Sequence, residues 1–164
     1  MTAAFPPGRG RDLAALVAFL AICFAVSGVG GALTATSVDG WYRTLAKPDF
    51  NPPAWVFPPV WTALFAAMAV AGWRVWRRAG LAGARAAFAA FAAQLALNLG
   101  WSALFFGLRS PGAALVEIVP LLAAIIVTGI LFWRIDRLAG LLFVPYALWV
   151  GFATLLTAAI WQLN

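Results

Sequence analysis

Five apolar stretches follow one another along the chain, at about residues 13–36, 58–76, 83–106, 111–133 and 138–161. A helix rises about 1.5 Å per residue and the hydrocarbon core of a bilayer is about 30 Å thick, so stretches of roughly 20 apolar residues are long enough to span it. Hydrophobic residues make up 65% of the chain and charged residues 10%, against about 45–50% and about 25% in soluble domains. The sequence therefore predicts an all-α membrane protein with five transmembrane helices.

The connections between these stretches decide how the helices are arranged. Three connections are short, which favours an up-down bundle. The exception is the loop of residues 37–57. A polar tail, residues 1–12, precedes a single domain at 13–164. The first stretch is longer than the roughly 7–15 apolar residues of a signal peptide, so we expect it to be retained as a helix.

Basic residues gather at one end of the predicted bundle. That end receives the N-terminus and the connections after the second and fourth helices, and it carries Arg9, Arg11, Arg74, Arg77, Arg78, Arg85, Arg134 and Arg137. The other end carries Arg43, Lys47 and Arg109. Arginines at the ends of apolar stretches indicate membrane topology rather than nucleic-acid binding. The bias predicts a bacterial inner-membrane protein with a cytoplasmic N-terminus. Because the charge count assumes the inner membrane, a location in the outer membrane stays an alternative.

Several kinds of chemistry are excluded by composition. The chain has no histidine and one cysteine, Cys23, which lies inside an apolar stretch. Metal sites built on imidazole, histidine-based catalysis and an internal disulfide are therefore excluded. No acid/base pair, nucleophile or metal cluster is visible, so we expect no obligatory cofactor and no conventional catalytic site.

The rare polar residues of the apolar stretches gather in one half of the predicted bundle. Up-down topology brings the small-residue segment SGVGGALTAT, Trp61, Asn98 with Trp101, Glu117, and Ala153 with Thr157 to the end where the long loop lies. Polar groups inside a membrane usually face the bundle interior, so this clustering predicts a ligand pocket under the loop. Asn98 has an alternative role as an interhelical hydrogen-bonding residue. For Glu117 the alternatives are a protonated carboxyl, an ion pair with Arg109, or a place facing the pocket.

The segment KPDFNPPAWVFPPVW, residues 47–61, holds five of the ten prolines. Proline fixes φ and removes a backbone donor, so such a segment orders at low entropic cost. We interpret the loop as a semi-rigid lid over the pocket, with Trp55 and Phe57 as anchors. The residues assigned to the lid are Trp41, Lys47, Pro48, Trp55 and Phe57.

Small residues at a spacing of four mark the third helix: Ala82, Ala86 and Ala90, and Ala89 with Ala93. Such stripes allow close helix packing. They predict either a homodimer through this helix or packing within one chain.

Three blocks together resemble one known family: WYRTLAKPDFNPPAWVFPPVW (41–61), LALNLGWSALFFG (95–107) and AGLLFVPYALWVGFA (139–153). In this order and spacing they are similar to the tryptophan-rich sensory protein and translocator protein family, TspO/MBR, also called peripheral benzodiazepine receptors. The resemblance covers about residues 13–164. It implies five transmembrane helices, frequent dimerisation and a loop-covered pocket for porphyrins, isoquinoline-type drugs and, in several members, cholesterol.

The resemblance also implies roles for individual residues. Trp61 matches the pocket tryptophan tied to light-dependent porphyrin breakdown. Asn98, Trp149 and Ala153 match pocket-wall positions, and Phe65 stands where the family often has tyrosine. Thr157 stands where the family often has asparagine, and the ending AAIWQLN lacks the tyrosine and arginine of the proposed cholesterol motif.

Three functions follow from these observations. The leading one is a porphyrin-binding receptor that regulates tetrapyrrole metabolism or a stress response, with membrane lipids around it and a tetrapyrrole or lipid-like molecule in its pocket. The porphyrin would stack against Trp61, Trp101 and Trp149, near Arg43 and Lys47, with Tyr146 and Glu117 as further contacts. The alternatives are transport of amphipathic substrates, with Glu117 coupled to protons, and light-dependent porphyrin degradation.

Overall fold

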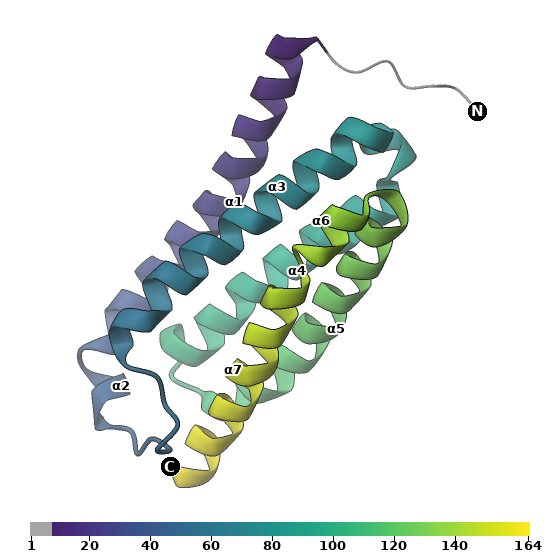
Figure 1. Ribbon diagram of the computed structural model, residues 1–164. Helices are drawn as coiled ribbons and strands as arrows, with labels where there is room; N and C mark the ends of the chain where they lie inside the picture. The colour runs from purple at the N-terminus through teal and green to yellow at the C-terminus, as the bar shows by residue number, and fades with distance from the viewer. Residues whose placement is uncertain (1–7) are drawn as a thin grey trace.

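The computed structural model describes residues 8–164, so the first seven residues of the predicted tail lie outside the described part. Five membrane-length helices form an elongated bundle (Figure 1), and no strand occurs within the described range. They are α1 (Arg9–Val38), α3 (Phe57–Gly83, after the 3-10 turn Ala54–Val56), α4 (Arg85–Ser102, continued by the π-helix Ala103–Gly107), α5 (Pro111–Ile135), and α6 (Arg137–Leu141) with α7 (Val144–Leu163). The predicted fold class is confirmed.

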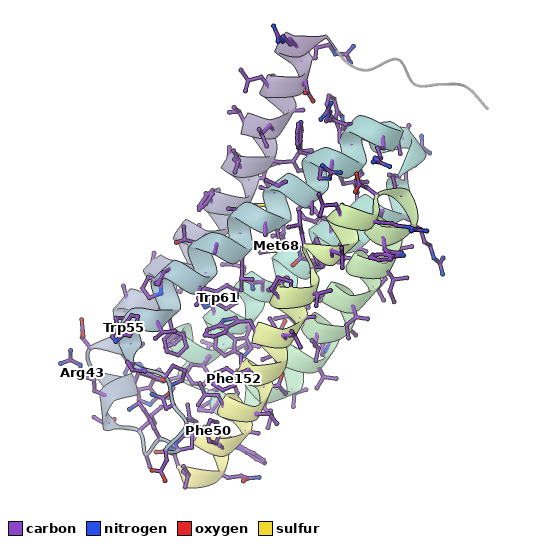
Figure 2. All side chains as sticks on the ribbon, viewed as in Figure 1. Arg43, Phe50, Trp55, Trp61, Met68 and Phe152 are labelled. Carbon is purple, nitrogen blue, oxygen red and sulfur yellow. The ribbon has the colours of Figure 1, made fainter. Side chains whose placement is uncertain are left out.

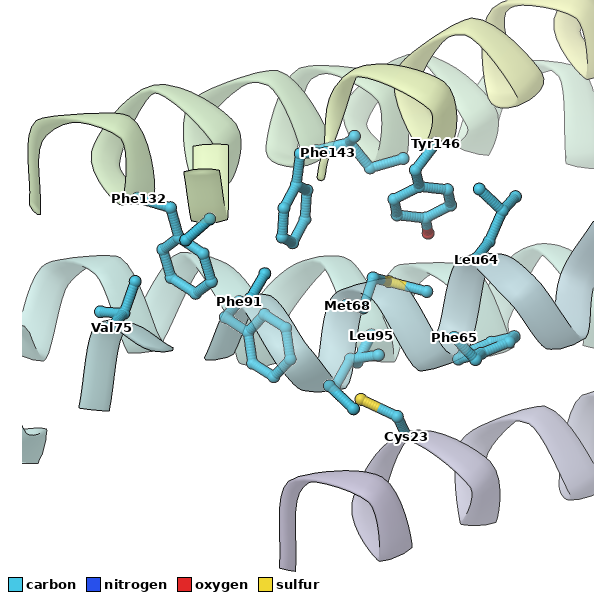
Figure 3. Close-up of a cluster of buried hydrophobic side chains, with 14 of the residues drawn as sticks. Cys23, Leu64, Phe65, Met68, Val75, Phe91, Leu95, Phe132, Phe143 and Tyr146 are labelled. Atoms are coloured by element: carbon cyan, nitrogen blue, oxygen red, sulfur yellow. The ribbon is translucent and has the colours of Figure 1, made fainter. Parts of the chain in front are cut away.

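The helices pack as a closed ring. α1 contacts α3 and α4, α4 contacts α5, α5 contacts α7, and α3 completes the ring through α5 and α6. Figure 3 shows the side chains that fill its centre, among them Met68, Phe91, Phe132 and Phe143. Because lipid cannot hydrogen-bond the backbone, helices packed in this way are the expected solution.

Several helix boundaries differ from those expected. α1 begins at Arg9, so residues 9–12 of the expected tail are helical, and α3 continues through Arg74, Arg77 and Arg78 to Gly83. Arginine is a good helix former and can extend its charged end toward water while its stem stays apolar. Charge therefore marked where the hydrocarbon ends, not where the helix ends. α3 is interrupted only at Gly80, whose φ of +63° is readily adopted by glycine alone.

The predicted loop 37–57 is shorter and more ordered than expected. α1 continues to Val38, α2 (Trp41–Thr44) forms one helical turn, and α3 begins at Phe57. The fifth stretch is also divided, because α6 ends at Leu141 and α7 starts with Pro145 in its first turn. Proline is favoured there since its missing N–H would have no helical partner anyway.

The alanine stripe of the third apolar stretch faces outward. Ala82, Ala86, Ala89 and Ala93 are exposed and Ala90 is partly exposed. These residues therefore do not serve packing within the described chain, and the homodimer through this face stays a prediction.

A buried carboxylate ties α3 to the corner between α5 and α6. Asp136, 2% exposed, accepts hydrogen bonds from Arg78 Nε at 2.8 Å, Arg74 Nη2 at 2.9 Å and the Ala139 N–H at 3.1 Å. Burial by itself would raise the pKa of Asp136. The Ala139 N–H and the two guanidinium groups outweigh burial and lower this pKa below its ordinary value.

A second carboxylate joins α1 to α3 at the same end of the bundle. Asp12 accepts from Arg77 Nε at 3.1 Å and from Trp73 Nε1 at 3.0 Å, and the Arg77 guanidinium stacks over the Trp73 ring at 4.7 Å. The two clusters hold three spans together at the end where α1 begins, which we call the arginine end.

We expect Asp136→Asn to lower the free energy of unfolding by about 1–3 kcal/mol at pH 7, because two guanidinium groups lose their anionic partner. A lowered pKa means that this stabilisation is present at neutral pH and is lost as pH falls below about 4. The difference between wild type and variant should therefore shrink in acid. Unfolding in detergent micelles followed by circular dichroism measures both effects.

Asp39→Asn is the matched control, since Asp39 forms an exposed ion pair with Arg43 and such pairs contribute little. Equal losses in the two variants would contradict the role given to Asp136.

Candidate functional site

A cavity of about 720 Å³ lies in the half of the bundle next to the loop. This volume falls within the roughly 300–1,000 Å³ of typical small-molecule sites. Its walls come from all five spans, and segment 38–58 contributes to its mouth. The surface is mostly apolar, with a few polar groups from Ser27, Thr34, Asn98, Ser102 and Thr157. The arrangement is that of a ligand site enclosed by membrane helices.

Six of the eight residues predicted to bind a ligand line this cavity: Trp61, Phe65, Asn98, Trp101, Trp149 and Ala153. The Trp61 ring lies 5.8 Å from the Phe65 ring, and Figure 2 shows Trp61 directed into the bundle. Trp101 stacks on Phe105 at 5.0 Å, and Trp149 meets Phe57 edge-on at 5.8 Å. Three indoles thus reach the cavity from α3, α4 and α7.

Tyr146 lies behind the wall rather than in it. It is fully buried, and its hydroxyl accepts from Asn98 Nδ2 at 2.9 Å and donates to Gln94 Oε1 at 3.1 Å. Gln94 Nε2 in turn approaches Met68 Sδ at 3.7 Å. Asn98 therefore bonds across to α7 and also lines the cavity, so its two predicted roles coexist. The network fixes the orientation of Asn98 before any ligand arrives.

Glu117 is also absent from the cavity wall. It lies between α5 and α4, where a Cβ added to Gly100 would be 3.6 Å from Glu117 Oε1. Both carboxyl oxygens are buried without a hydrogen-bond partner among the described residues, as is the indole N–H of Trp101. The expected ion pair with Arg109 does not form, because Arg109 Nε instead donates to Ser37 Oγ at 3.4 Å.

The lid residues divide into two groups. Lys47 and Phe57 line the cavity, whereas Trp41, Pro48 and Trp55 do not. Trp41 packs edge-on against Phe105 at 5.7 Å. Trp55 is 75% exposed and lies on the outer side of the loop, where it suits an anchor in the membrane interface.

Sequence reasoning placed the end of α1 in this half of the bundle but singled out none of its residues as ligand contacts. Val26, Ser27, Gly30, Gly31 and Thr34 line the cavity. Gly30 permits close approach, since a Cβ there would lie 3.4 Å from Ser102 Oγ. The cluster of small residues SGVGG was a usable signal. Phe105 and Phe106, in the π-helix, were also missed; π-helices recur at functional sites but leave no simple sequence pattern.

The lid is attached to α7 by a residue that the sequence did not single out. Asn164 Oδ1 accepts from the Ala46 N–H at 2.9 Å, and Asn164 Nδ2 donates to the Ala46 carbonyl at 3.0 Å. Phe50 adds an edge-on contact with Phe152 at 6.3 Å (Figure 2). The loop is therefore held over the cavity by α7.

Five membrane-spanning helices around an aromatic, loop-covered cavity define an integral multi-pass membrane protein. The chain belongs to the TspO/MBR family, whose family model matches residues 19–162. It is 43% identical to the tryptophan-rich protein TspO of Chlorobaculum tepidum, over 94% of this chain and 98% of that one. It is 40% identical to the tryptophan-rich sensory protein of Cereibacter sphaeroides (93% of each chain) and 35% identical to the translocator protein of Sus scrofa (85% and 86%). The resemblance read from the three blocks is confirmed.

We expect Asn164→Ala to loosen the lid. Loss of both hydrogen bonds to Ala46 should raise the amide exchange rate of residues 45–47 about tenfold, since each bond contributes about 0.5–1.5 kcal/mol. Hydrogen–deuterium exchange with mass spectrometry measures this rate. Gln162→Ala is the matched control, because Gln162 is exposed and makes no recorded bond to the lid. Unchanged exchange in Asn164→Ala would show that the two bonds do not hold the loop.

Proposed function

We propose that the cavity binds a planar tetrapyrrole such as a porphyrin, and that the protein acts as a sensor or regulator of tetrapyrrole metabolism or of a stress response. The observation that carries the proposal is the convergence of Trp61, Trp101 and Trp149 on one cavity of about 720 Å³. Flat aromatic faces bind well against indole rings through dispersion and offset stacking. The family resemblance and the sensory protein among the relatives support the same function.

The mouth of the cavity supports an anionic group on the ligand. Arg43 and Lys47 both line it. Arg43 pairs with Asp39 at 2.8 Å, and Lys47 Nζ lies over the Tyr42 ring at 4.7 Å. The Arg43–Asp39 pair is exposed, and Lys47 Nζ also donates to the Leu45 carbonyl at 3.1 Å; a propionate on the ligand can replace these contacts. Asn98 supplies a polar contact deeper in the cavity.

Binding through the ring faces fits better than binding through a metal at the ring centre. The chain has no histidine. Cys23, Met68 and Tyr146 are fully buried outside the cavity wall, and Tyr42, which lines the cavity, donates its hydroxyl to Asn51 Oδ1 at 3.1 Å. A metal-free porphyrin or another apolar aromatic molecule, such as an isoquinoline-type drug, is therefore the ligand class we propose.

Protoporphyrin IX should quench the tryptophan fluorescence of the purified protein as it binds. Trp61→Phe and Trp149→Phe should each weaken binding roughly three- to tenfold, because a smaller ring stacks less strongly. Trp133→Phe is the matched control, since Trp133 lies outside the cavity. Fluorescence titration gives the three affinities. Equal affinities in all variants would reject stacking in this cavity.

Transport remains the second candidate, and the observation that favours it is the buried, unpartnered carboxyl of Glu117. Reconstituted vesicles separate the two functions. Porphyrin uptake driven by a pH gradient and abolished by Glu117→Gln would establish transport, whereas binding without uptake would support the sensor. A Trp61-dependent product formed under light would instead indicate degradation.

We infer further that the protein lies in the bacterial inner membrane with its arginine end in the cytoplasm. Eight of the eleven basic residues support this orientation through the positive-inside rule. In a Cys23→Ser background, a membrane-impermeant maleimide added to intact spheroplasts should label Thr44→Cys. It should label Arg134→Cys only after permeabilisation. The reverse pattern would overturn the orientation.

A further inference from the structure

The net charge of the protein resides entirely at the arginine end. Eight arginines lie there against Asp12 and Asp136, which leaves six positive charges, equal to the formal net charge of +6. At the cavity end Arg43, Lys47 and Arg109 are balanced by Asp39, Asp49 and Glu117. One end of the bundle is thus strongly cationic and the other neutral.

The acidic residues of the arginine end already bond to other side chains of the fold. Asp136 is 2% exposed and bonds to Arg74 and Arg78, while Asp12 bonds to Arg77 and Trp73. Five exposed arginines have no acidic partner among the described residues: Arg9, Arg11, Arg85, Arg134 and Arg137. The positive field at this surface is therefore available to an external anion.

Local helix electrostatics favour Arg134, which lies in the last turn of α5, but do not account for the others. Arg9, Arg11 and Arg85 lie in the first turns of α1 and α4. The helix dipole disfavours cations at that position. Their placement costs free energy within the chain, and a neighbouring anion offsets that cost.

Exposed apolar side chains neighbour the unpaired arginines along the chain. Trp133 is 44% exposed next to Arg134, and Leu138 and Leu141 are about half exposed next to Arg137. α4 and α5 pack against each other in opposite directions, so Arg85 at the start of α4 lies at the same end as Arg134. The surface offers cations at the end of the membrane span and apolar contacts just within it.

We propose that this surface, formed by Arg85, Arg134, Arg137, Trp133, Leu138 and Leu141, binds acidic phospholipids. The headgroup phosphate lies against the guanidinium groups and the acyl chains against the tryptophan and leucines. A free phosphate uses only the cations, and a soluble acidic partner leaves the apolar side chains uncovered. The proposal does not depend on the ligand of the cavity.

The test compares unfolding midpoints in micelles doped with phosphatidylglycerol or with phosphatidylcholine. Wild type should be stabilised by phosphatidylglycerol, and Arg134→Gln/Arg137→Gln should need a lipid fraction up to roughly 25-fold higher for half of that effect. The estimate follows from about 1 kcal/mol per basic residue near an acidic surface, or about fivefold for each arginine. High salt should weaken the response of wild type.

Two controls isolate the surface. Arg134→Lys/Arg137→Lys keeps the charge and should retain most of the response, and Arg43→Gln removes a cation at the other end and should retain all of it. An equal response in the glutamine variant and wild type would overturn the proposal. So would an equal midpoint shift from inorganic phosphate alone, because the surface would then be a site for a free anion.

Discussion

Hydrocarbon offers no hydrogen-bond partner, and the whole structure follows from that constraint. Every backbone N–H and C=O in a span must bond within its own helix, so five apolar stretches become five helices. Pro120 lacks an N–H inside α5, and the other departures from regular helix lie toward the ends of spans: Gly80 near the end of α3, the π-helix Ala103–Gly107 at the end of α4, and the break before Pro145. There, water, loops or neighbouring helices can satisfy the backbone.

The two ends of the bundle perform different tasks. At the arginine end, Asp136 and Asp12 gather guanidinium groups and join three spans. α3 packs on α6 near this end, whereas farther along Trp61 of α3 and Trp149 of α7 line the cavity between them. A closed, ion-paired end thus allows the other end to enclose empty volume. Packing in the hydrophobic core that Figure 3 shows compensates for the contacts that side chains lose around the cavity.

Prediction succeeded where the type of a residue by itself indicates where it lies in a membrane protein. Trp61, Asn98 and Trp101 were placed in one half by counting along up-down helices, Trp149 was assigned through the family resemblance, and all four line the cavity. The method failed where rotation about the helix axis matters. Glu117 lies at the expected end but faces α4, and Tyr146, predicted to bind a ligand, is buried behind the cavity wall. Helix ends were misjudged wherever arginines continue a helix beyond the hydrocarbon.

The sequence by itself determined the number of spans, the family, the separation of charge and the half of the bundle that holds the polar residues, because each depends on composition along one dimension. Only the tertiary structure decided that α1 forms part of the cavity wall, that Asn98 is held by Tyr146, and that Asn164 fastens the lid. These contacts join residues far apart in the chain, and helix rotation and packing set them.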